Sequence, residues 1–427
     1  MKRFFDASLD RLLLQGSANP WRDGMRLFFS VGEPSGDLHG ANLIRQLRRI
    51  DPDYECVGYG GPRMREAGCQ LHFDLPELAV MWFLRVLFKL PQFLRLLWQA
   101  DRYFCRQPPD AVILIDYPGF NWWIARRAKA RGIPVFYYGS PQLWAWAGWR
   151  ISKMRRYVNH LLCKLPFEVP WYEQRNCRAT YVGHPYFDQL AEQILDAAFE
   201  LELLQDGRPL LTLLPGSRDQ EVRSNLPTLI RAAQRVQLQF PGLRVAIASF
   251  NRRQAALAAD MVAAANTPIE VFSGKTAELI RRAECCLACS GSVSLELLYF
   301  QKPSVIVYRV HWLAKRLEGY FRRVRFISLV NLLASERRFT TRGELYDPQA
   351  PDAGEVPFPE YLTSKDCAAE VAEHAIRWLR DPQERQRVVA QLGHLRELWG
   401  KPGASLKAAE HIDCVLRAAS RNLRASA

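Results

Sequence analysis

The sequence predicts an α/β protein made of two doubly wound halves, each a parallel β-sheet with helices on both faces. Short apolar runs without polar alternation, typical of strands buried on both faces, alternate with helical segments through most of the 427 residues. This alternation ends near residue 186 and starts again at Leu210. With 48% hydrophobic residues the chain can fill two cores, so two domains of ordinary size are expected.

The expected elements follow from these runs. Strands of the first half are predicted at residues 26–31, 55–59, 111–115, 134–138, 161–165 and 179–182, and those of the second half at 210–214, 243–248, 269–272, 285–288 and 304–308. The predicted parts are an N-terminal extension (1–24), a first domain (25–186), a second domain (187–365) and C-terminal helices (366–427) that cross back to the first domain. Residues 347–359, rich in Pro, Asp and Glu, are predicted to form a surface loop.

Polar residues follow the first and third strands of the first half. The first strand leads into Gly32-Glu33-Pro34-Ser35-Gly36-Asp37, and the third into Asp116-Tyr117-Pro118-Gly119-Phe120-Asn121. In doubly wound folds, ligands lie beyond the carboxyl ends of the strands, where these loops emerge. The carboxylates have an alternative role as helix caps, Asp37 for the helix that follows it and Asp116 for the one near Asn121. His39 is expected on the surface of the first helical turn.

The second half begins with an apolar run, residues 210–214, that ends in Pro215 and Gly216. Ser217 can cap the next helix with Gln220 as its capping-box partner. A helix N-terminus and the guanidinium of Arg218 would together suit a phosphate group. The alternative is an ordinary strand–turn–helix connection with a solvent-facing arginine.

The net charge indicates a class of partner, and the cysteines indicate a cellular compartment. Lysine and arginine number 58 against 44 aspartates and glutamates, a net charge of +14, which favours an anionic partner: nucleic acid, a membrane surface or a phosphorylated substrate. The ten cysteines are scattered, and Cys286-x-x-Cys289 lies in an apolar run, so a reducing cytoplasm and a core position are expected. Asp6 and Asp10 interrupt the N-terminal apolar residues, which makes a poor signal peptide.

Residues 80–98 form an apolar segment that is too interrupted by charge and Pro91 to span a membrane. Its basic and amide residues recur at helical spacing among several aromatic residues, a pattern typical of a helix lying on an anionic bilayer. Pro91 is expected to kink or split this helix. The alternative is a core helix with one solvent-exposed edge.

Together, these loops resemble those of the lipid-A-disaccharide synthase family. The matching pieces are Gly32 to Asp37, Gly60-Gly61-Pro62-Arg63-Met64, Leu78-Ala79-Val80-Met81, Asp116 to Asn121, Ser140 to Trp146, Leu165-Pro166-Phe167-Glu168, Val182-Gly183-His184-Pro185, Leu213 to Arg218, Ser290-Gly291-Ser292 with Glu296, and Asn331-Leu332-Leu333-Ala334. Gly343-Glu344-Leu345 departs from the Pro-Glu-Leu form usual in the family.

The resemblance implies a GT-B glycosyltransferase, with two Rossmann-like domains facing a cleft. Such enzymes condense UDP-2,3-diacylglucosamine with 2,3-diacylglucosamine 1-phosphate (lipid X) and release UDP. They are peripheral on the cytoplasmic face of the inner membrane of Gram-negative bacteria. We therefore expect these two substrates, an anionic membrane surface and a second copy of the chain as partners, and no nucleic acid, cofactor or metal ion.

An inverting transfer needs a base for the acceptor proton and groups that hold the leaving diphosphate, and positions at strand ends and helix starts indicate candidates for these roles, with Asn331 matching a family position at the donor pocket. Asp116 is the expected base, with Glu33 and Asp37 as further catalytic candidates. The expected substrate-binding residues are Ser35, Met81, Arg218, Ser290, Gly291, Ser292, Glu296 and Asn331. Two other functions are weighed: a UDP-sugar epimerase of the same fold, which needs no membrane helix, and a basic nucleic-acid-binding protein. The aromatic residues cluster in one loop and one helix and do not alternate with basic residues, which is unlike a nucleic-acid-binding module.

Overall fold

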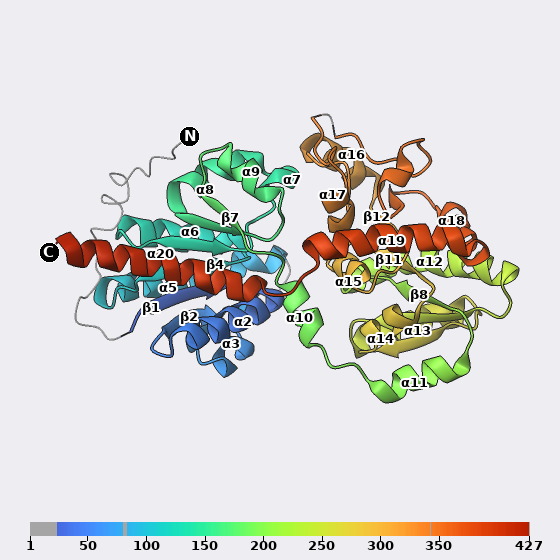
Figure 1. Ribbon diagram of the computed structural model, residues 1–427, viewed down its shortest axis with the longest axis horizontal. Helices are drawn as coiled ribbons and strands as arrows, with labels where there is room; N and C mark the ends of the chain where they lie inside the picture. The colour runs from blue at the N-terminus through green and yellow to red at the C-terminus, as the bar shows by residue number, and fades with distance from the viewer. Residues whose placement is uncertain (1–23, 80–82, 342, 427) are drawn as a thin grey trace. The chain divides into compact units, whose positions relative to one another are not determined.

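The computed structural model describes residues 24–79, 83–341 and 343–426, which form two compact α/β units. Unit 1 contains the described residues up to Asp188 together with the C-terminal segment from Pro402, and unit 2 runs from Gln189 to Lys401 (Figure 1). The segment predicted as C-terminal helices, 366–427, is therefore divided between the two units.

Unit 1 contains a parallel sheet of seven strands in the order β3-β2-β1-β4-β5-β6-β7. The strands are β1 (Arg26–Val31), β2 (Glu55–Gly60), β3 (Gln70–Asp74), β4 (Ala111–Ile115), β5 (Val135–Tyr138), β6 (His160–Cys163) and β7 (Ala179–Tyr181). The chain winds outward from β1 in one direction and from β4 in the other, so the topological switch point lies between these two strands.

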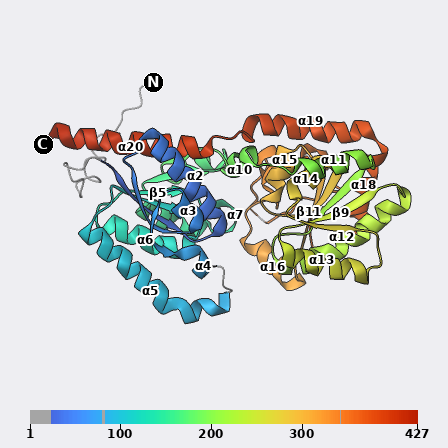
Figure 2. The same cartoon turned by 90° about the horizontal axis from the view of Figure 1, so that it is seen from below.

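Helices cover both faces of this sheet. They are α2 (Pro34–Ile50), α3 (Pro62–Glu66), α4 (Leu75–Ala79), α5 (Phe83–Arg106), α6 (Pro118–Ala130), α7 (Leu143–Trp146), the 3₁₀ turn η1 (Gly148–Arg150), α8 (Ile151–Tyr157), α9 (Glu168–Glu173), α10 (Tyr186–Glu192), which reaches the unit boundary, and α20 (Ala404–Ser426). Buried side chains of α2 and α20 share one core, and those of α5 and α6 share the other, on the opposite face in Figure 2.

Unit 2 contains six parallel strands in the order β10-β9-β8-β11-β12-β13. The strands are β8 (Leu210–Leu214), β9 (Arg244–Ser249), β10 (Glu270–Ser273), β11 (Cys285–Cys289), β12 (Ser304–Arg309) and β13 (Glu360–Thr363). All five residues of β8 and of β11 are buried, as their unbroken apolar sequences predict. The switch point of this sheet lies between β8 and β11.

The helices of unit 2 also cover both faces. They are α11 (Ala197–Asp206), α12 (Asp219–Gln239), α13 (Arg252–Ala264), α14 (Thr276–Arg282), α15 (Val293–Tyr299), α16 (Trp312–Phe321), α17 (Leu329–Ala334), the 3₁₀ turn η2 (Ala353–Glu355), α18 (Ala368–Arg380) and α19 (Pro382–Trp399). Buried side chains of α12, α13 and α18 form one core with the strands, while α11, α14, α15 and α19 lie on the other side of the sheet in Figure 2.

The two doubly wound halves predicted from the sequence are confirmed. Each predicted strand is present within two residues of its expected ends, and Cys286 and Cys289 are buried in β11. Two edge strands were missed, β3 and β13. β13 begins at Glu360, directly after the predicted surface loop.

Candidate active site

Four loops flank the two switch points at the carboxyl ends of the strands. In unit 1 these are the loops that follow β1, from Gly32, and β4, from Asp116; in unit 2 they follow β8, from Pro215, and β11, from Ser290. Ligands of doubly wound folds bind at this position. Most of the residues predicted from the sequence therefore lie where a ligand is expected in their own unit.

The backbone at the end of β4 is strained. Asp116 and Tyr117 have φ angles of 48° and 42°, a left-handed conformation that costs roughly 1–2 kcal/mol for each residue other than glycine. The hydroxyl of Tyr137 donates to the carbonyl oxygen of Asp116 at 2.6 Å, and Asn121 Nδ2 donates to the same oxygen at 2.8 Å. Such strain persists only where the surroundings impose it, and it is typical of functional sites.

Asn121 connects this turn to the neighbouring strand. Its side chain is fully buried, and Nδ2 also donates to the carbonyls of Ser30 and Ile115 at 3.1 and 3.2 Å. Its Oδ1 accepts from the Ser30 hydroxyl at 2.7 Å. The ends of β1 and β4 are thus fastened to each other directly beneath Asp116.

The Asp116 carboxylate points toward the first turn of α2 and toward Lys164. A β-carbon built on Gly36 would lie 3.1 Å from Asp116 Oδ2, so a larger residue at Gly36 would crowd the carboxylate. The Lys164 ammonium lies 3.6 Å from Oδ1, and both side chains are about 18% exposed. Helix α6 begins at Pro118 with Tyr117 as its N-cap, so Asp116 does not cap it. The sequence analysis did not identify Lys164, because this residue follows β6 and only the fold brings its side chain to Asp116 at the end of β4.

The residues of the loop after β1 have different environments. Glu33 and Ser35 are exposed at the start of α2, and burial, with a smaller contribution from Glu33, raises the pKa of Tyr117. Asp37 is buried and accepts from the backbone N–H groups of Gly61, Arg63 and Met64 at 2.8, 3.0 and 3.1 Å. Asp37 therefore caps α3, and the expectation that it caps its own helix was wrong.

Two histidines lie near this site. His39 is 8% exposed, so its predicted surface position was wrong: it lies in the second turn of α2 and interacts electrostatically with Asp116, Lys164 and Asp188, which the fold brings to it. Burial lowers the pKa of His39 to about 4, and burial also holds the pKa of His184 well below its usual value. Both rings are therefore neutral at pH 7, and neither adds charge beside Asp116 and Lys164.

In unit 2, the turn after β8 differs from the predicted capping box. Gly216, at φ 124°, reverses the chain, and the helix α12 starts at Asp219 with Arg218 as N-cap. The Glu221 carboxylate, and not Gln220, accepts from the N–H groups of Ser217 and Arg218 at 2.9 and 3.2 Å. A β-carbon at Gly216 would lie 2.6 Å from Glu221 Cβ, so only glycine fits this turn.

Arg218 has the exposure expected of a ligand-binding residue. Its side chain is 80% exposed and donates to Glu221 Oε1 at 3.0 Å. Buried Asn225 ties this helix to the next loop, because its Nδ2 donates to the Glu221 carbonyl at 2.9 Å and to Cys289 Sγ at 3.2 Å. The loops after β8 and β11 are thereby held together.

The remaining residues that were predicted to bind the donor lie in the loop after β11, in α15 and in α17. Gly291 and Ser292 are exposed at the start of α15, and Glu296 is buried one turn later. The Ser290 hydroxyl donates to the carbonyl of Ile327 at 2.7 Å. Asn331 is fully buried, and its Nδ2 donates to Phe358 O at 2.7 Å and Glu360 Oε1 at 2.8 Å. A substrate contact by the Asn331 side chain would have to replace these bonds.

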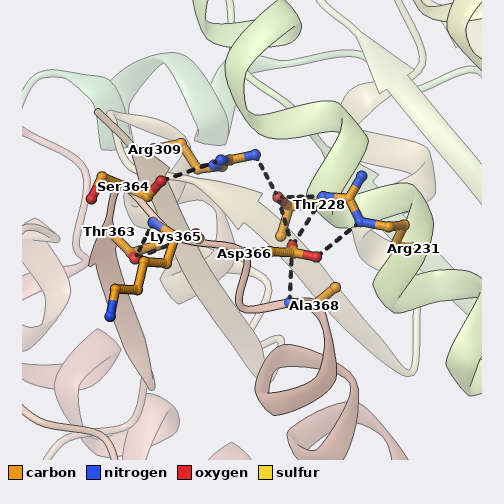
Figure 3. Close-up of polar contacts among 8 residues, drawn as sticks. All are labelled: Thr228, Arg231, Arg309, Thr363, Ser364, Lys365, Asp366 and Ala368. Atoms are coloured by element: carbon orange, nitrogen blue, oxygen red, sulfur yellow. Dashed lines mark hydrogen bonds and ion pairs between the residues drawn. The ribbon is translucent and has the colours of Figure 1, made fainter. Parts of the chain in front are cut away.

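A separate polar network closes the carboxyl ends of β12 and β13. Asp366 accepts from Arg231 Nη2 at 3.0 Å and Nε at 3.1 Å, while the Arg309 guanidinium reaches Thr228 Oγ1 at 3.3 Å and the Ser364 carbonyl at 3.4 Å (Figure 3). The Lys365 side chain points away from this cluster. Because the guanidinium groups of Arg231 and Arg309 already have hydrogen-bond partners on α12 and in the β13–α18 loop, we interpret this network as structural.

Helix α5 is continuous from Phe83 to Arg106 with Pro91 inside it, so of the two predicted outcomes, a kink or a split, the split did not occur. Leu90, Leu94 and Trp98 are 53%, 57% and 58% exposed. Met81 and Trp82 lie outside the described residues, and so do the side chains of residues 78–89. No helix in the described ranges is long and apolar enough to cross a membrane.

Comparisons with known proteins identify the family of this chain. The family model described as lipid-A-disaccharide synthetase matches residues 27–345. A lipid-A-disaccharide synthase of Coxiella burnetii is 34% identical over 393 residues, 90% of this chain and 96% of that protein. One of Trichlorobacter lovleyi is 35% identical over 385 residues, again covering 90% and 96%.

Solved structures share the fold at low sequence identity. A UDP-GlcNAc 2-epimerase from Neisseria meningitidis, bound to UDP-GlcNAc, is similar with a TM-score of 0.59 and 9% identity, covering 91% of this chain and 99% of that one. The MurG protein of Acinetobacter baumannii gives a TM-score of 0.52 and 12% identity, covering 91% and 99%. Two parallel-sheet α/β domains of the GT-B class are thus the fold of this chain.

Proposed function

Because the chain belongs to the lipid-A-disaccharide synthetase family, we propose that it holds the acceptor sugar at unit 1 and the donor at unit 2, in each case at the carboxyl ends of the strands. It is an inverting glycosyltransferase that condenses UDP-2,3-diacylglucosamine with 2,3-diacylglucosamine 1-phosphate. The products are the β-1,6 disaccharide 1-phosphate and UDP. Neither an epimerase nor a nucleic-acid-binding protein accounts for the family match over residues 27–345.

Asp116 is the proposed base. Inversion requires that the acceptor's 6-hydroxyl attack the donor's anomeric carbon from the face opposite UDP, while a base removes the hydroxyl proton. The observation that carries this assignment is the pair of left-handed residues, Asp116 and Tyr117, held by Asn121 and Tyr137. Lys164 supplies a positive charge beside the carboxylate, and Glu33 and Ser35, exposed at the start of α2, are proposed to orient the acceptor.

Arg218 is proposed to bind the donor diphosphate. Its guanidinium is exposed at the N-terminus of the 21-residue helix α12, where the partial positive charge of the helix favours an anion. The diphosphate would replace Glu221 as the partner of the guanidinium. Stabilising the negative charge that develops on departing UDP then lowers the barrier to transfer. Gly291 and Ser292 border the same switch point, and Glu296 is proposed to accept from ribose hydroxyls.

A peripheral position on an anionic membrane is also part of the proposal. It is supported by the net charge of +14 and by the exposed line of Leu90, Leu94 and Trp98 on α5. The acyl chains of both substrates would then reach the active site from the bilayer. A homodimer stays a prediction.

The replacement Asp116→Asn tests the assignment of the base. Asparagine preserves size but cannot take a proton, and a general base contributes about 10²–10⁴-fold, so turnover should fall by that factor. The affinity for UDP should stay at the parental value, because UDP binds to the other unit. Disaccharide formation and calorimetric UDP binding measure the two quantities.

Arg218→Ala serves as the matched donor-side variant. Loss of a charge-assisted contact, worth about 1.5–3 kcal/mol, should weaken UDP binding by one to two orders of magnitude. Parental turnover in a folded Asp116→Asn protein would remove Asp116 from the mechanism and leave Glu33 as the candidate. Parental UDP affinity in Arg218→Ala would place the diphosphate elsewhere.

A further inference from the structure

Glu360 is a buried acid that the proposed mechanism does not use. It is the first residue of β13 and only 4% of its surface is exposed. Its Oε2 accepts from the backbone N–H of Ile327 at 2.7 Å. Its Oε1 accepts from the N–H of Ser328 at 3.0 Å, from the Ser328 hydroxyl, and from Asn331 Nδ2 at 2.8 Å. Four donors therefore converge on one carboxylate.

All four donors belong to the segment from Ile327 to Asn331, which leads into α17. The Ser328 hydroxyl caps that helix by accepting from the N–H of Asn331 at 3.2 Å. Asn331 is also bonded at both ends of its amide to the backbone of Phe358, at 2.7 and 3.2 Å. Glu360 and Phe358 thus determine where this segment lies against the sheet.

The same segment contacts the loop after β11. The carbonyl of Ile327 accepts from the Ser290 hydroxyl at 2.7 Å, and the N–H of Ile327 donates to Glu360. One residue therefore joins the buried carboxylate to the first residue of the Ser290–Gly291–Ser292 loop. Since α15 and α17 also pack against each other, a shift of the 327–331 segment would be transmitted to this loop.

We propose that Glu360 is a positioning residue for the donor site: its carboxylate fixes the 327–331 segment and, through Ile327, the Ser290 hydroxyl and the loop that follows it. This inference rests on the proposed function, in which that loop borders the bound UDP. It also assigns to Asn331 a role in supporting the loop and not in touching the substrate.

The arrangement of donors suits a carboxylate anion better than a neutral polar side chain. Every contact to Glu360 is a donor, so a protonated carboxyl or an amide would place a hydrogen against a donor that already points at it. Burial, which is the largest cause, raises the pKa of Glu360 to about 7 despite the four donors. The positioning should therefore weaken as the pH falls through about 7 and the carboxylate takes a proton.

Two ionisable groups of the same region, Tyr346 and Asp352, have pKa values shifted further away from 7. Tyr346 interacts electrostatically with Glu360, and burial, with a smaller contribution from Glu360, raises the pKa of its phenol, which stays neutral. Arg325 is ion-paired with Asp352 at 2.9 Å, and this contact lowers the pKa of Asp352. An inflection of UDP affinity near pH 7 that disappears in Glu360→Gln can therefore be assigned to titration of the Glu360 carboxyl.

Binding and stability should respond to pH in opposite directions. Glu360 has a higher pKa in the folded protein than the usual 4.5, so the folded state binds more protons between pH 4.5 and about 7. Protonation of Glu360 thus stabilises the fold as the pH falls through this window. UDP affinity, in contrast, should fall, because the loop loses its anchor. A residue with a purely structural role would not produce this divergence.

The experiment measures UDP dissociation constants by calorimetry from pH 6 to 9 for the full chain, Glu360→Gln and the control Glu355→Gln. Glu355 is an exposed carboxylate in η2, five residues before Glu360, so its replacement should leave UDP affinity and its pH dependence unchanged. Glu360→Gln should weaken binding about tenfold at pH 8, the effect of losing one charge-assisted hydrogen bond, and should abolish the inflection near pH 7. Titration of UDP itself is common to all three proteins and cancels in the comparison.

Ser328→Ala provides a second, milder variant if Glu360→Gln does not fold. It removes one donor and the cap of α17 while keeping the carboxylate buried, and should weaken UDP binding about threefold and retain the inflection. Parental affinity with a parental pH profile in Glu360→Gln overturns the inference, as does parental affinity in Ser328→Ala where only that variant folds.

Two further variants separate this inference from the function on which it rests. If Arg218→Ala and Ser290→Ala both bind UDP like the parent, the donor site itself is misplaced, and the role of Glu360 falls with it. If both weaken UDP binding but Glu360→Gln does not, the donor site stands and only the positioning role is overturned.

Discussion

At the scale of single residues, two consecutive unfavourable backbone conformations and two buried polar side chains meet at the proposed base. Asp116 and Tyr117 adopt left-handed backbone angles, and their strain is offset by bonds from Asn121 and Tyr137. Burial raises the pKa of Tyr137 well above its usual value, so its phenol stays a hydrogen-bond donor. The carboxylate is therefore held in place by its backbone and not only by its ion pair with Lys164.

The replacements Tyr137→Phe and Asn121→Ala test this support. Tyr137→Phe removes one of two donors to the Asp116 carbonyl, so stability should fall by about 1 kcal/mol and turnover by less than about tenfold. Asn121→Ala leaves three carbonyls without this donor and should cost about 2–4 kcal/mol, with a larger loss of turnover. Urea unfolding and steady-state kinetics measure the two effects.

The informative result is the order of the two losses: turnover should fall more in Asn121→Ala than in Tyr137→Phe. Acceptor KM should change little in Tyr137→Phe, because the side chain of Asp116 is still present and its surroundings are intact. Equal turnover in the parent and in a folded Asn121→Ala protein would show that the strained turn has no part in catalysis.

At the scale of elements, α5 has two different faces. Leu97, Ala100 and Phe104 are buried against the sheet, whereas Leu90, Leu94 and Trp98, four residues apart, are exposed along another side. Arg102 lies with its guanidinium 5.2 Å from the centre of the Trp98 ring. An exposed apolar line flanked by cations is typical of a helix at a bilayer surface.

Replacing Leu90, Leu94 and Trp98 together by serine should release the protein from anionic liposomes. Each side chain would contribute about 1.5–3 kcal/mol if fully buried in lipid, so the combined loss exceeds tenfold in binding. Raised salt should weaken the parent only in part, because screening removes the attraction between charges and leaves apolar burial. Co-sedimentation with liposomes measures both.

A matched triple variant controls for general loss of apolar surface. Leu201, Leu204 and Leu238 of unit 2 are 53%, 55% and 82% exposed, and their replacement by serine should leave liposome binding unchanged. Sedimentation of the α5 variant at the parental level would show that α5 is not the anchor.

At the scale of the whole molecule, the last helix of the chain completes the first unit. The Asp188 carboxylate accepts from the N–H groups of Gly403, Ala404 and Ser405 at 2.5, 3.1 and 2.8 Å. Buried α20 residues such as Ile412 then join the core that α2 forms with the sheet. Residues near position 188 and after position 402 are thus fastened to each other, although more than 200 residues separate them.

Buried neutral histidines should make the protein sensitive to acid. Burial lowers the pKa of His39 and of His374 to about 4, against 6.5 when unfolded. Their contribution to stability is complete above pH 6.5 and is lost as the pH falls toward 4, since only the unfolded state then binds the protons. Glu360 acts in the opposite sense between pH 7 and 4.5.

His39→Leu tests this sensitivity. Each histidine that titrates only on unfolding steepens the loss by up to about 1.4 kcal/mol per pH unit, so the variant should lose less stability than the parent between pH 6.5 and 4.5. The free energy of unfolding in urea, measured at several pH values, gives both slopes. Identical slopes would mean that His39 is protonated without cost in the folded protein.

The sequence by itself determined the central strands of both sheets and their order along the chain, but not the edge strands β3 and β13. Runs such as residues 111–115 and 210–214 are apolar throughout, and only burial on both faces of a parallel sheet suits them. Because the carboxyl ends of parallel strands meet at one edge, the loops at Asp116, Arg218 and Ser290 could be assigned to the site from their position in the chain. Local pattern was sufficient for these predictions.

Only the tertiary structure decided which partner each side chain has. Asp37 caps a helix 24 residues away, Lys164 meets Asp116 from another strand, and Glu360 binds donors 29 to 33 residues earlier. His39 is buried and interacts electrostatically with Asp116, Lys164 and Asp188, all distant from it in the sequence. A buried charge or donor must find a partner wherever the fold brings one, and that choice depends on contacts distant in the chain, which no local pattern contains.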